Sequence, residues 1–337
     1  MPTTRTTTNT PTTPTATAST TTKTTTPNPR ASTAASADAF GPWAPDPLAG
    51  FEAATLPLDA VPLDAEGEVV ATLVRRTLDA DPARDQRRRA VLSLPGWNDY
   101  FFHAHVAEFF EAQGFTFYAL DPRRSGRSLR DARYRDYVTD LGDYFVEVDA
   151  AASLIGRAHS SLTLLAHSTG GLVGSLWASE RPGAVDGVVL NSPWLAMWGP
   201  PAYGPALLPP LGVLARRDPL TRLRLPDPGE RYARHIHADF AGEWDYDREL
   251  KASGAVPVRA GWLSAVLRGH RRVARGLGIA APVFVACSTR SELKLQEGSE
   301  RARTSDIVLD VENIVAKAPR LGPHVTIVRV PDGFHDL

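Results

Sequence analysis

The segment Leu162-Thr163-Leu164-Leu165-Ala166-His167-Ser168-Thr169-Gly170-Gly171 decides the fold of this chain. Residues 162–166 form a short, mostly apolar run, which predicts a strand covered on both faces. A helix is predicted from Ser168 to about Ser179. A strand that passes directly into a helix turns sharply, so the Ser168 hydroxyl is expected over the carboxyl edge of the sheet. The alternative is a Ser-Thr-Gly-Gly turn in which Ser168 only caps the helix.

The segments on either side of this turn alternate between strand and helix patterns. An opening hairpin is predicted over residues 51–58 and 68–78, where apolar and polar residues alternate. Strands that alternate with helices after such a pair predict an α/β fold with a doubly wound, mostly parallel sheet. The predicted strands are 90–94, 115–120, 162–166, 187–190, 282–287 and 325–330, and the predicted helices are 103–113, 144–158 and 168–179.

Two segments depart from this alternation. Residues 1–40 are rich in threonine and have no apolar core to bury, so they are predicted to be a disordered tail. Residues 195–280 contain many prolines and clustered aromatic residues, which predicts an inserted, mainly helical cap. Its apolar inner face is expected from Trp194, Trp198, Tyr203 and residues 207–211. The amphipathic stretch 262–277 is interpreted as a cap helix over the site, with membrane-surface binding as the alternative. The core is then residues 41–194 and 281–337.

Composition excludes several classes of protein. The 337 residues carry a formal net charge of −1, so net charge predicts no nucleic-acid partner. The single cysteine, Cys287, excludes an intrachain disulfide and a thiolate zinc cluster. No apolar run reaches the roughly 18–20 residues of a membrane helix, so a cytoplasmic protein without stable membrane insertion is expected. His235 and His237 with Asp239 and Asp245 are interpreted as polar cap residues, and neither a metal nor a cofactor is predicted.

Three motifs carry a resemblance to a known family. Residues 166–171 (Ala-His-Ser-Thr-Gly-Gly) look like the serine turn of the serine aminopeptidase and monoacylglycerol lipase-like branch of the α/β-hydrolases. Residues 94–98 (Leu-Pro-Gly-Trp-Asn) resemble its oxyanion loop, with Pro95 in place of histidine. Residues 121–128 resemble its Asp-x-Arg-Gly-x-Gly-x-Ser loop. The arginines of that loop are interpreted as support for the serine turn, with binding of an anionic substrate group as the alternative.

This resemblance implies a set of catalytic residues. Ser168 would be the nucleophile, and His335, just beyond the last predicted strand, would be its general base. Asp306, in a segment that resembles the family's Ala-Asp-x-Val, would orient the histidine after an inserted loop of about 15 residues; Glu292 and Asp310 stay open as alternatives. The backbone amides of Trp97 and Thr169 would bind the oxyanion.

The expected function is hydrolysis of small carboxylic esters through an acyl-enzyme, with lipid-like or aryl acyl groups and a lysophospholipase or monoacylglycerol lipase-like specificity. Two alternatives stay open. One is an acyltransferase that uses the same triad, and the other is a non-catalytic member of the fold that only binds. A dehalogenase or epoxide hydrolase is disfavoured, because those relatives have an aspartate where this chain has Ser168.

Overall fold

A mostly parallel sheet forms the centre of the computed structural model, which describes residues 39–60, 63, 66–200, 202–224, 229–240, 242–254, 256–293 and 300–337. The strand order is β1-β2-β3-β5-β4-β6-β7-β8-β9. The hairpin β2–β3 is antiparallel, β3 runs antiparallel to β5, and the strands from β4 to β9 are parallel. The strands are β1 (Ala44–Pro45), β2 (Phe51–Pro57), β3 (Val70–Arg76), β4 (Arg89–Leu94), β5 (Phe115–Asp121), β6 (Ser161–His167), β7 (Gly187–Asn191), β8 (Val283–Ser288) and β9 (Val325–Val330).

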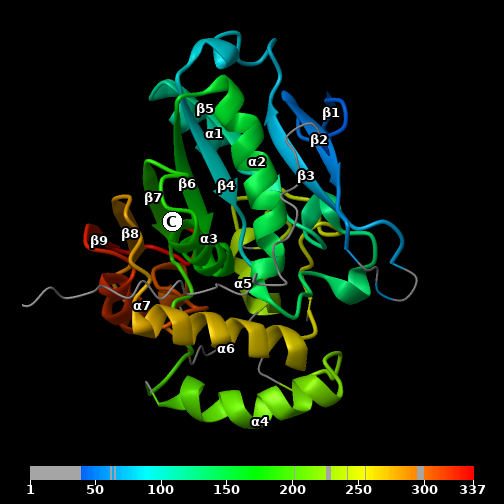
Figure 1. Ribbon diagram of the computed structural model, residues 1–337. Coiled ribbons are helices and arrows are strands. Elements are labelled where there is room, and N and C mark those ends of the chain that lie inside the picture. Colours follow the sequence, from blue (N-terminus) through cyan, green and yellow to red (C-terminus); the bar gives the residue numbers. More distant parts are fainter. Residues whose placement is uncertain are drawn as a thin grey trace, which may run out of the picture. The chain divides into compact units, whose positions relative to one another are not determined.

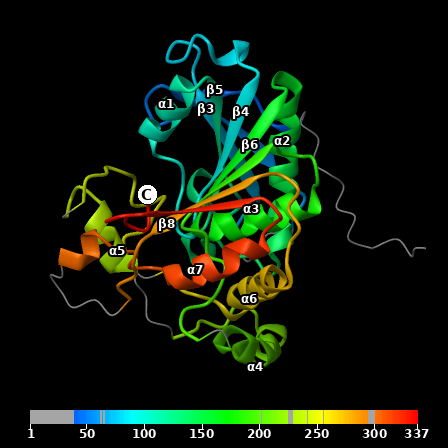
Figure 2. The same cartoon turned by 90° about the vertical axis from the view of Figure 1, so that its left-hand side faces the viewer.

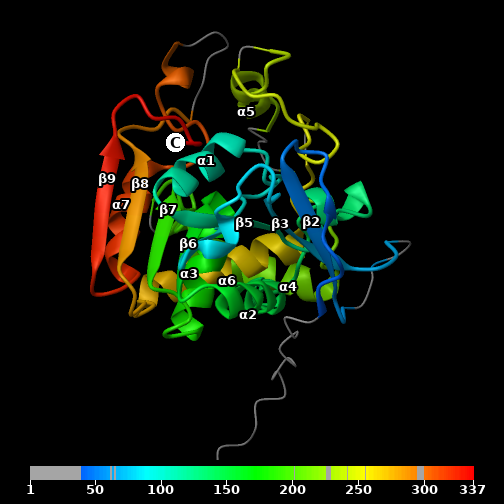
Figure 3. The same cartoon turned by 90° about the horizontal axis from the view of Figure 1, so that it is seen from above.

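Helices cover both faces of this sheet, so the predicted doubly wound fold is confirmed. One face packs on α1, where Ala107 meets Val91 and Phe117 in a buried cluster. The opposite face packs on α2, α3 and α7, and Figure 3 shows α1 on the other side of the sheet from α2 and α3. The α-helices are α1 (Ala104–Ala112), α2 (Phe145–Ala158), α3 (Ser168–Glu180), α4 (Tyr203–Arg217), α5 (Gly229–Ile236), α6 (Ala260–Arg275) and α7 (Val311–Lys317). The short 3₁₀ turns are Arg84–Gln86, Gly126–Ser128, Ala132–Tyr134, Leu141–Tyr144, Glu300–Arg303 and Ala318–Arg320.

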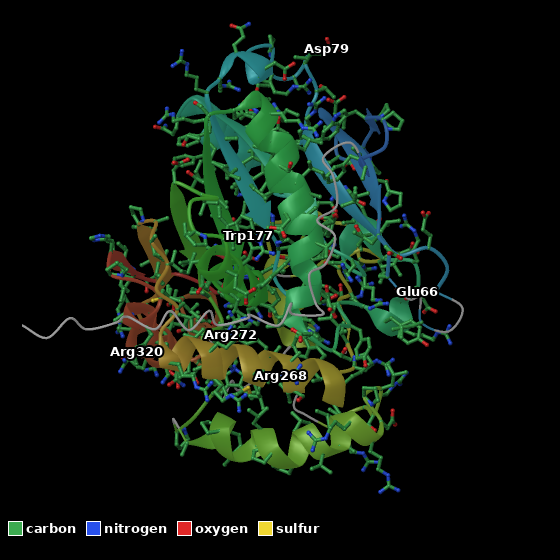
Figure 4. The ribbon with its side chains drawn as sticks, viewed as in Figure 1. Glu66, Asp79, Trp177, Arg268, Arg272 and Arg320 are labelled. Carbon is green, nitrogen blue, oxygen red and sulfur yellow. The ribbon has the colours of Figure 1, made fainter. Side chains whose placement is uncertain are left out.

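The strand β6 and the helix α3 form the middle of the core. Leu164 and Ala166 of β6 are fully buried, as expected for a strand between two helical layers. Trp177 of α3 is buried as well, and its indole N–H donates to the Asp149 carboxylate of α2 over 2.8 Å. Figure 4 labels this tryptophan. The turn at Ser168 is therefore attached to the buried middle of the core.

The segment between β7 and β8 contains α4, α5 and α6. In Figure 1, α6 lies against the core and α4 lies on its outer side. Eleven residues of α6 are buried, and none of α4 is. Within the segment 195–280, predicted as a cap, α6 packs on α3 and on α4. The predicted tail, residues 1–40, lies outside the described residues except for its last two.

Three arginines of the loop at residues 121–128, which follows β5, are paired inside the protein. Their partners are buried or nearly buried carboxylates, so each guanidinium stabilises the loop from within. This arrangement agrees with the interpretation of the loop as support for the serine turn. The pairs are Arg123–Glu147 (2.7 Å), Arg124–Glu66 (2.5 Å; Glu66 is labelled in Figure 4) and Arg127 with Asp121 (2.8 Å) and Asp46 (2.6 Å).

None of the helices that the structure describes combines the length and the apolar character needed to cross a membrane. Polar residues of α6 instead form an ion pair and a hydrogen bond with other parts of the chain. Its Arg272 pairs with Glu180 of α3 over 2.6 Å, and its Arg268 donates to the Thr139 carbonyl. Figure 4 labels both arginines on this helix.

The buried pair Arg123–Glu147 predicts a large effect of Glu147→Ala. Removal of this fully buried carboxylate leaves the Arg123 charge without compensation, which should lower the free energy of unfolding by about 3–5 kcal/mol. Glu312→Ala is the matched control, because it breaks an Arg–Glu pair of the same length whose glutamate is 72% exposed. We expect about 0.5 kcal/mol or less for the control. Urea unfolding measures both, and equal losses would contradict this account.

Candidate active site

Ser168 lies at the junction of β6 and α3, where the backbone is strained. Its φ is +49°, which a non-glycine residue rarely adopts. The Trp194 N–H donates to the Ser168 carbonyl over 2.9 Å and holds this conformation. Gly170 allows α3 to approach the loop after β4, since a Cβ at residue 170 would lie 2.2 Å from the Pro95 carbonyl oxygen. The strain at Ser168 is therefore held in place by contacts on both sides of the turn.

The structure brings Ser168, His335 and Asp306 together, although they are far apart in the sequence. Nε2 of His335 lies 3.0 Å from Oγ of Ser168, and Nδ1 lies 2.9 Å from Oδ2 of Asp306. The other carboxylate oxygen, Oδ1, accepts the N–H groups of Val308 (2.8 Å) and Leu309 (2.7 Å). All three side chains are buried, with Ser168 8% exposed and Asp306 fully covered. A carboxylate held in this way orients the imidazole so that Nε2 faces the hydroxyl.

The loop after β8 explains how Asp306 reaches this position. Ser291 and Asp306 pair in an isolated β-bridge. The Asp306 N–H donates to the Arg290 carbonyl (3.0 Å), and the Glu292 N–H donates to the Asp306 carbonyl (2.8 Å). The two ends of the inserted loop are thus joined beside the end of β8, so the insertion does not displace the aspartate.

The two other candidate carboxylates have different positions. Asp310 caps α7, where its carboxylate accepts the Glu312 N–H over 3.1 Å. Glu292 contributes its backbone N–H to the bridge that closes the loop. Among the three candidates, Asp306 is the one whose carboxylate contacts His335.

The predicted oxyanion residues border one cavity. Trp97 and Thr169 both line a space of about 30 Å³, together with Gly96 and Gly170. The remaining lining is mostly apolar, and the Trp97 ring packs on Trp262 of α6 with centroids 5.3 Å apart. Trp262 belongs to the stretch 262–277, interpreted from the sequence as a cap helix over the site, but no local pattern predicts its contact with Trp97, 165 positions away.

A second group of ionisable side chains, which no pattern in the sequence predicted, adjoins this site. The Lys251 ammonium lies 2.7 Å from Asp99 and 4.0 Å from Asp336. Tyr232 donates its hydroxyl to Asp336 over 2.6 Å, and His167 lies 3.6 Å from the same carboxylate. These residues come from four separate segments, so the sequence carries no signal that would group them.

Electrostatics keep Lys251, Asp99 and Asp336 of this group ionised. Burial acts to raise the pKa of Asp336, but His167, Lys251 and His103 lower it well below its ordinary value. Burial acts in the opposite direction on Lys251, yet the charges of Asp99 and Asp336 raise its pKa above the usual range. The carboxylates and the ammonium stabilise one another as charged groups.

The predicted cap contains His235 and His237 with Asp239 and Asp245. Across the ranges that the structure describes, no group of three or more His, Cys, Asp or Glu could hold a metal ion. His237 serves its own segment instead: Nδ1 accepts the Asp239 N–H over 3.0 Å, and Nε2 lies 3.1 Å from the Tyr246 carbonyl oxygen. Cys287 is buried in β8.

A doubly wound sheet with a serine at a strand–helix turn, and a histidine beyond the last strand, defines the α/β-hydrolase fold. The model of the serine aminopeptidase family S33 matches residues 85–336. The chain belongs to this family, and the resemblance stated from the three motifs is confirmed.

Similar proteins include several monoacylglycerol lipases. A monoacylglycerol lipase of Mycolicibacterium smegmatis is 31% identical over 121 residues, which are 35% of this chain and 40% of that lipase. The crystal structure of the Paleococcus ferrophilus monoacylglycerol lipase has a TM-score of 0.54 at 20% identity, over 73% of this chain and 86% of that one. A soluble variant of the Saccharomyces cerevisiae monoglyceride lipase has a TM-score of 0.53 at 12% identity, over 80% and 85%. The two solved structures share the fold.

Asp136, which also lines the cavity, predicts a pH-dependent stability. Burial raises its pKa to about 7, although Oδ2 accepts the Asn98 N–H over 2.6 Å. The folded protein therefore keeps a proton that the unfolded chain releases at about pH 4, so this group lowers stability as the pH rises from about 4 to about 7.

Asp136→Asn should remove this dependence, because an amide oxygen still accepts the Asn98 N–H but does not ionise. The free energy of unfolding of the variant minus that of the wild type should rise by up to about 1.4 kcal/mol per pH unit over this range and then stay constant. Urea unfolding from pH 4.5 to pH 8 measures the difference, and parallel curves would show the assignment to be wrong.

Proposed function

We propose that this chain is a serine hydrolase that cleaves carboxylic esters through an acyl-enzyme. The observation that carries the proposal is the hydrogen-bonded series from Ser168 through His335 to Asp306. A serine hydroxyl is a weak nucleophile until a base accepts its proton, and Nε2 of His335 lies within reach of that proton.

The reaction would proceed in two halves. Ser168 Oγ attacks the ester carbonyl carbon while His335 Nε2 accepts the hydroxyl proton, and the Trp97 and Thr169 amides bind the oxyanion. The intermediate then expels the alcohol, which takes the proton from His335. In the second half, His335 removes a proton from water, and the resulting hydroxide attacks the acyl carbon. The carboxylic acid leaves, and Ser168 recovers its proton.

Asp306 would orient the imidazole throughout this cycle. Its two backbone hydrogen bonds hold the side chain in place, and its contact with Nδ1 keeps the ring turned towards Ser168.

Small esters with lipid-like or aryl acyl groups are the proposed substrates. The monoacylglycerol lipases among the similar proteins favour an acylglycerol or a related ester. The aromatic lining agrees with an apolar acyl group, since Trp262 contacts Trp97 on one side and Trp194 on the other, with centroids 5.3 and 5.9 Å apart. The cytoplasmic location stays a prediction from the sequence.

Ser168→Ala should abolish labelling by a fluorophosphonate probe, because the probe reacts with an activated serine hydroxyl. The native chain should label, and hydrolysis of p-nitrophenyl esters should be lost together with labelling in the variant. Ser175→Ala is the matched control, since this buried serine of α3 donates to the Gly171 carbonyl. It lies about two turns from Ser168 along the same helix. A folded native chain that neither labels nor hydrolyses any ester would overturn the proposed function.

Asp306→Asn should lower kcat by about 10³–10⁴-fold, because an amide in place of the carboxylate favours the wrong imidazole tautomer. Asp310→Asn should leave kcat within about twofold, since this side chain caps α7. Steady-state kinetics with p-nitrophenyl butyrate compares the two. Equal losses, or a larger loss for Asp310→Asn, would reject Asp306 as the orienting acid.

A further inference from the structure

We propose that the segment from α5 to Ala252 is a positioning element for this reaction. Tyr232 and Lys251 hold the carboxylate of Asp336, the residue that follows His335 in the chain. Lys251 and Ala252 hold the loop that carries Trp97. The inference rests on the proposed function, and it adds two positioning residues, Tyr232 and Lys251, that touch none of the reacting atoms.

The first set of contacts fixes the segment that carries His335. Residues 331–337 follow β9 without regular secondary structure, so side-chain contacts must fix the histidine. Tyr232 stacks its ring on Phe334 with an interplanar angle of 4°, and its hydroxyl donates to Asp336 over 2.6 Å. Both chain neighbours of His335 are therefore held by one tyrosine, and its ring also meets the His335 ring edge-on with centroids 5.9 Å apart. Figure 2 shows α5 beside the end of the chain.

The second set of contacts fixes the loop after β4, which carries Trp97. Asn98 exchanges two hydrogen bonds with the backbone of Ala252: its Nδ2 donates to the carbonyl (2.8 Å), and its Oδ1 accepts the N–H (2.9 Å). Asn98 has a φ of +55°, a conformation that this pairing stabilises directly beside Trp97. The neighbouring residue, Asp99, is buried against the Lys251 ammonium and accepts the Gly96 N–H over 3.4 Å.

Lys251 takes part in both sets of contacts and so connects the loop after β4 with the segment that carries His335. Its ammonium lies between Asp99 of the oxyanion loop and Asp336 of the histidine segment, and the rings of Phe102, Tyr232 and Tyr246 surround it at 5.0–5.5 Å. A buried cation with two carboxylates fixes the distance between the segments that carry them, because separation would leave charges unpaired in a medium of low polarity. The general base and the oxyanion donors are thus placed by the same side chain.

Catalysis should be more sensitive to these contacts than stability is. Displacement of a catalytic group by about 1 Å can lower a rate about 100-fold, whereas one lost hydrogen bond changes stability only modestly. This difference separates a positioning role from a purely structural one.

The primary test is Tyr232→Phe, which removes one hydroxyl and keeps the ring on Phe334. The matched control is Tyr118→Phe, because Tyr118 of β5 is buried and its hydroxyl lies 3.0 Å from Nε2 of His159, away from the site. We measure kcat and KM with p-nitrophenyl butyrate, the second-order rate of fluorophosphonate labelling, and the melting temperature. Tyr232→Phe should lower kcat and the labelling rate about tenfold with KM within twofold, while the control keeps wild-type kinetics at a similar change in melting temperature.

A second variant tests the contacts between Asn98 and Ala252. Asn98→Gly keeps a residue that tolerates a positive φ but removes both bonds to Ala252, and it should also slow labelling about tenfold. Wild-type labelling rates in both Tyr232→Phe and Asn98→Gly would overturn the inference while leaving the proposed function intact. A native chain that does not label would overturn the proposed function and this inference together. Equal kinetic losses in Tyr232→Phe and Tyr118→Phe would indicate a general structural effect and would also overturn it.

Discussion

The left-handed backbone at Ser168 is the constraint on which the rest of the structure depends. A φ of +49° is costly for serine, so it persists only where neighbouring contacts determine it. Here the Trp194 N–H binds the Ser168 carbonyl, and α3 approaches the Pro95 carbonyl so closely that residue 170 must lack a side chain. His270 of α6 contacts the Trp194 carbonyl in turn, with Nε2 2.9 Å from the oxygen. Helix α6, within the segment predicted as a cap, therefore helps to hold the serine turn.

Charged groups are buried around this turn because each has a partner. The arginines after β5 pair with carboxylates from β5, α2 and the N-terminal part of the described chain, and Lys251 pairs with Asp99. Removing one partner from such a pair leaves an uncompensated charge, so every pair fixes two loops relative to each other. The loops that surround Ser168 are thus held by ion pairs as well as by apolar packing.

Local patterns predicted much of this arrangement. The strand and helix assignments depended on periodicity and apolar runs, which report burial directly, and the parallel sheet followed from their alternation. Ser168 was identifiable because a strand–turn–helix junction is a local feature. The carboxylate that contacts His335 was not, since Glu292, Asp306 and Asp310 all follow the same strand and differ only in how the loop between them folds. The bridge between Ser291 and Asp306 decides which carboxylate contacts His335.

The sequence by itself determined the fold class, the family resemblance and the position of the serine, because each depends on residues that are neighbours along the chain. Only the tertiary structure decided which carboxylate contacts His335, and it placed α6 against α3. It also brought Lys251 beside Asp99, 152 residues away, and Tyr232 beside Asp336. Contacts of this kind depend on how distant segments pack, and a pattern of residues within one segment carries no information about them.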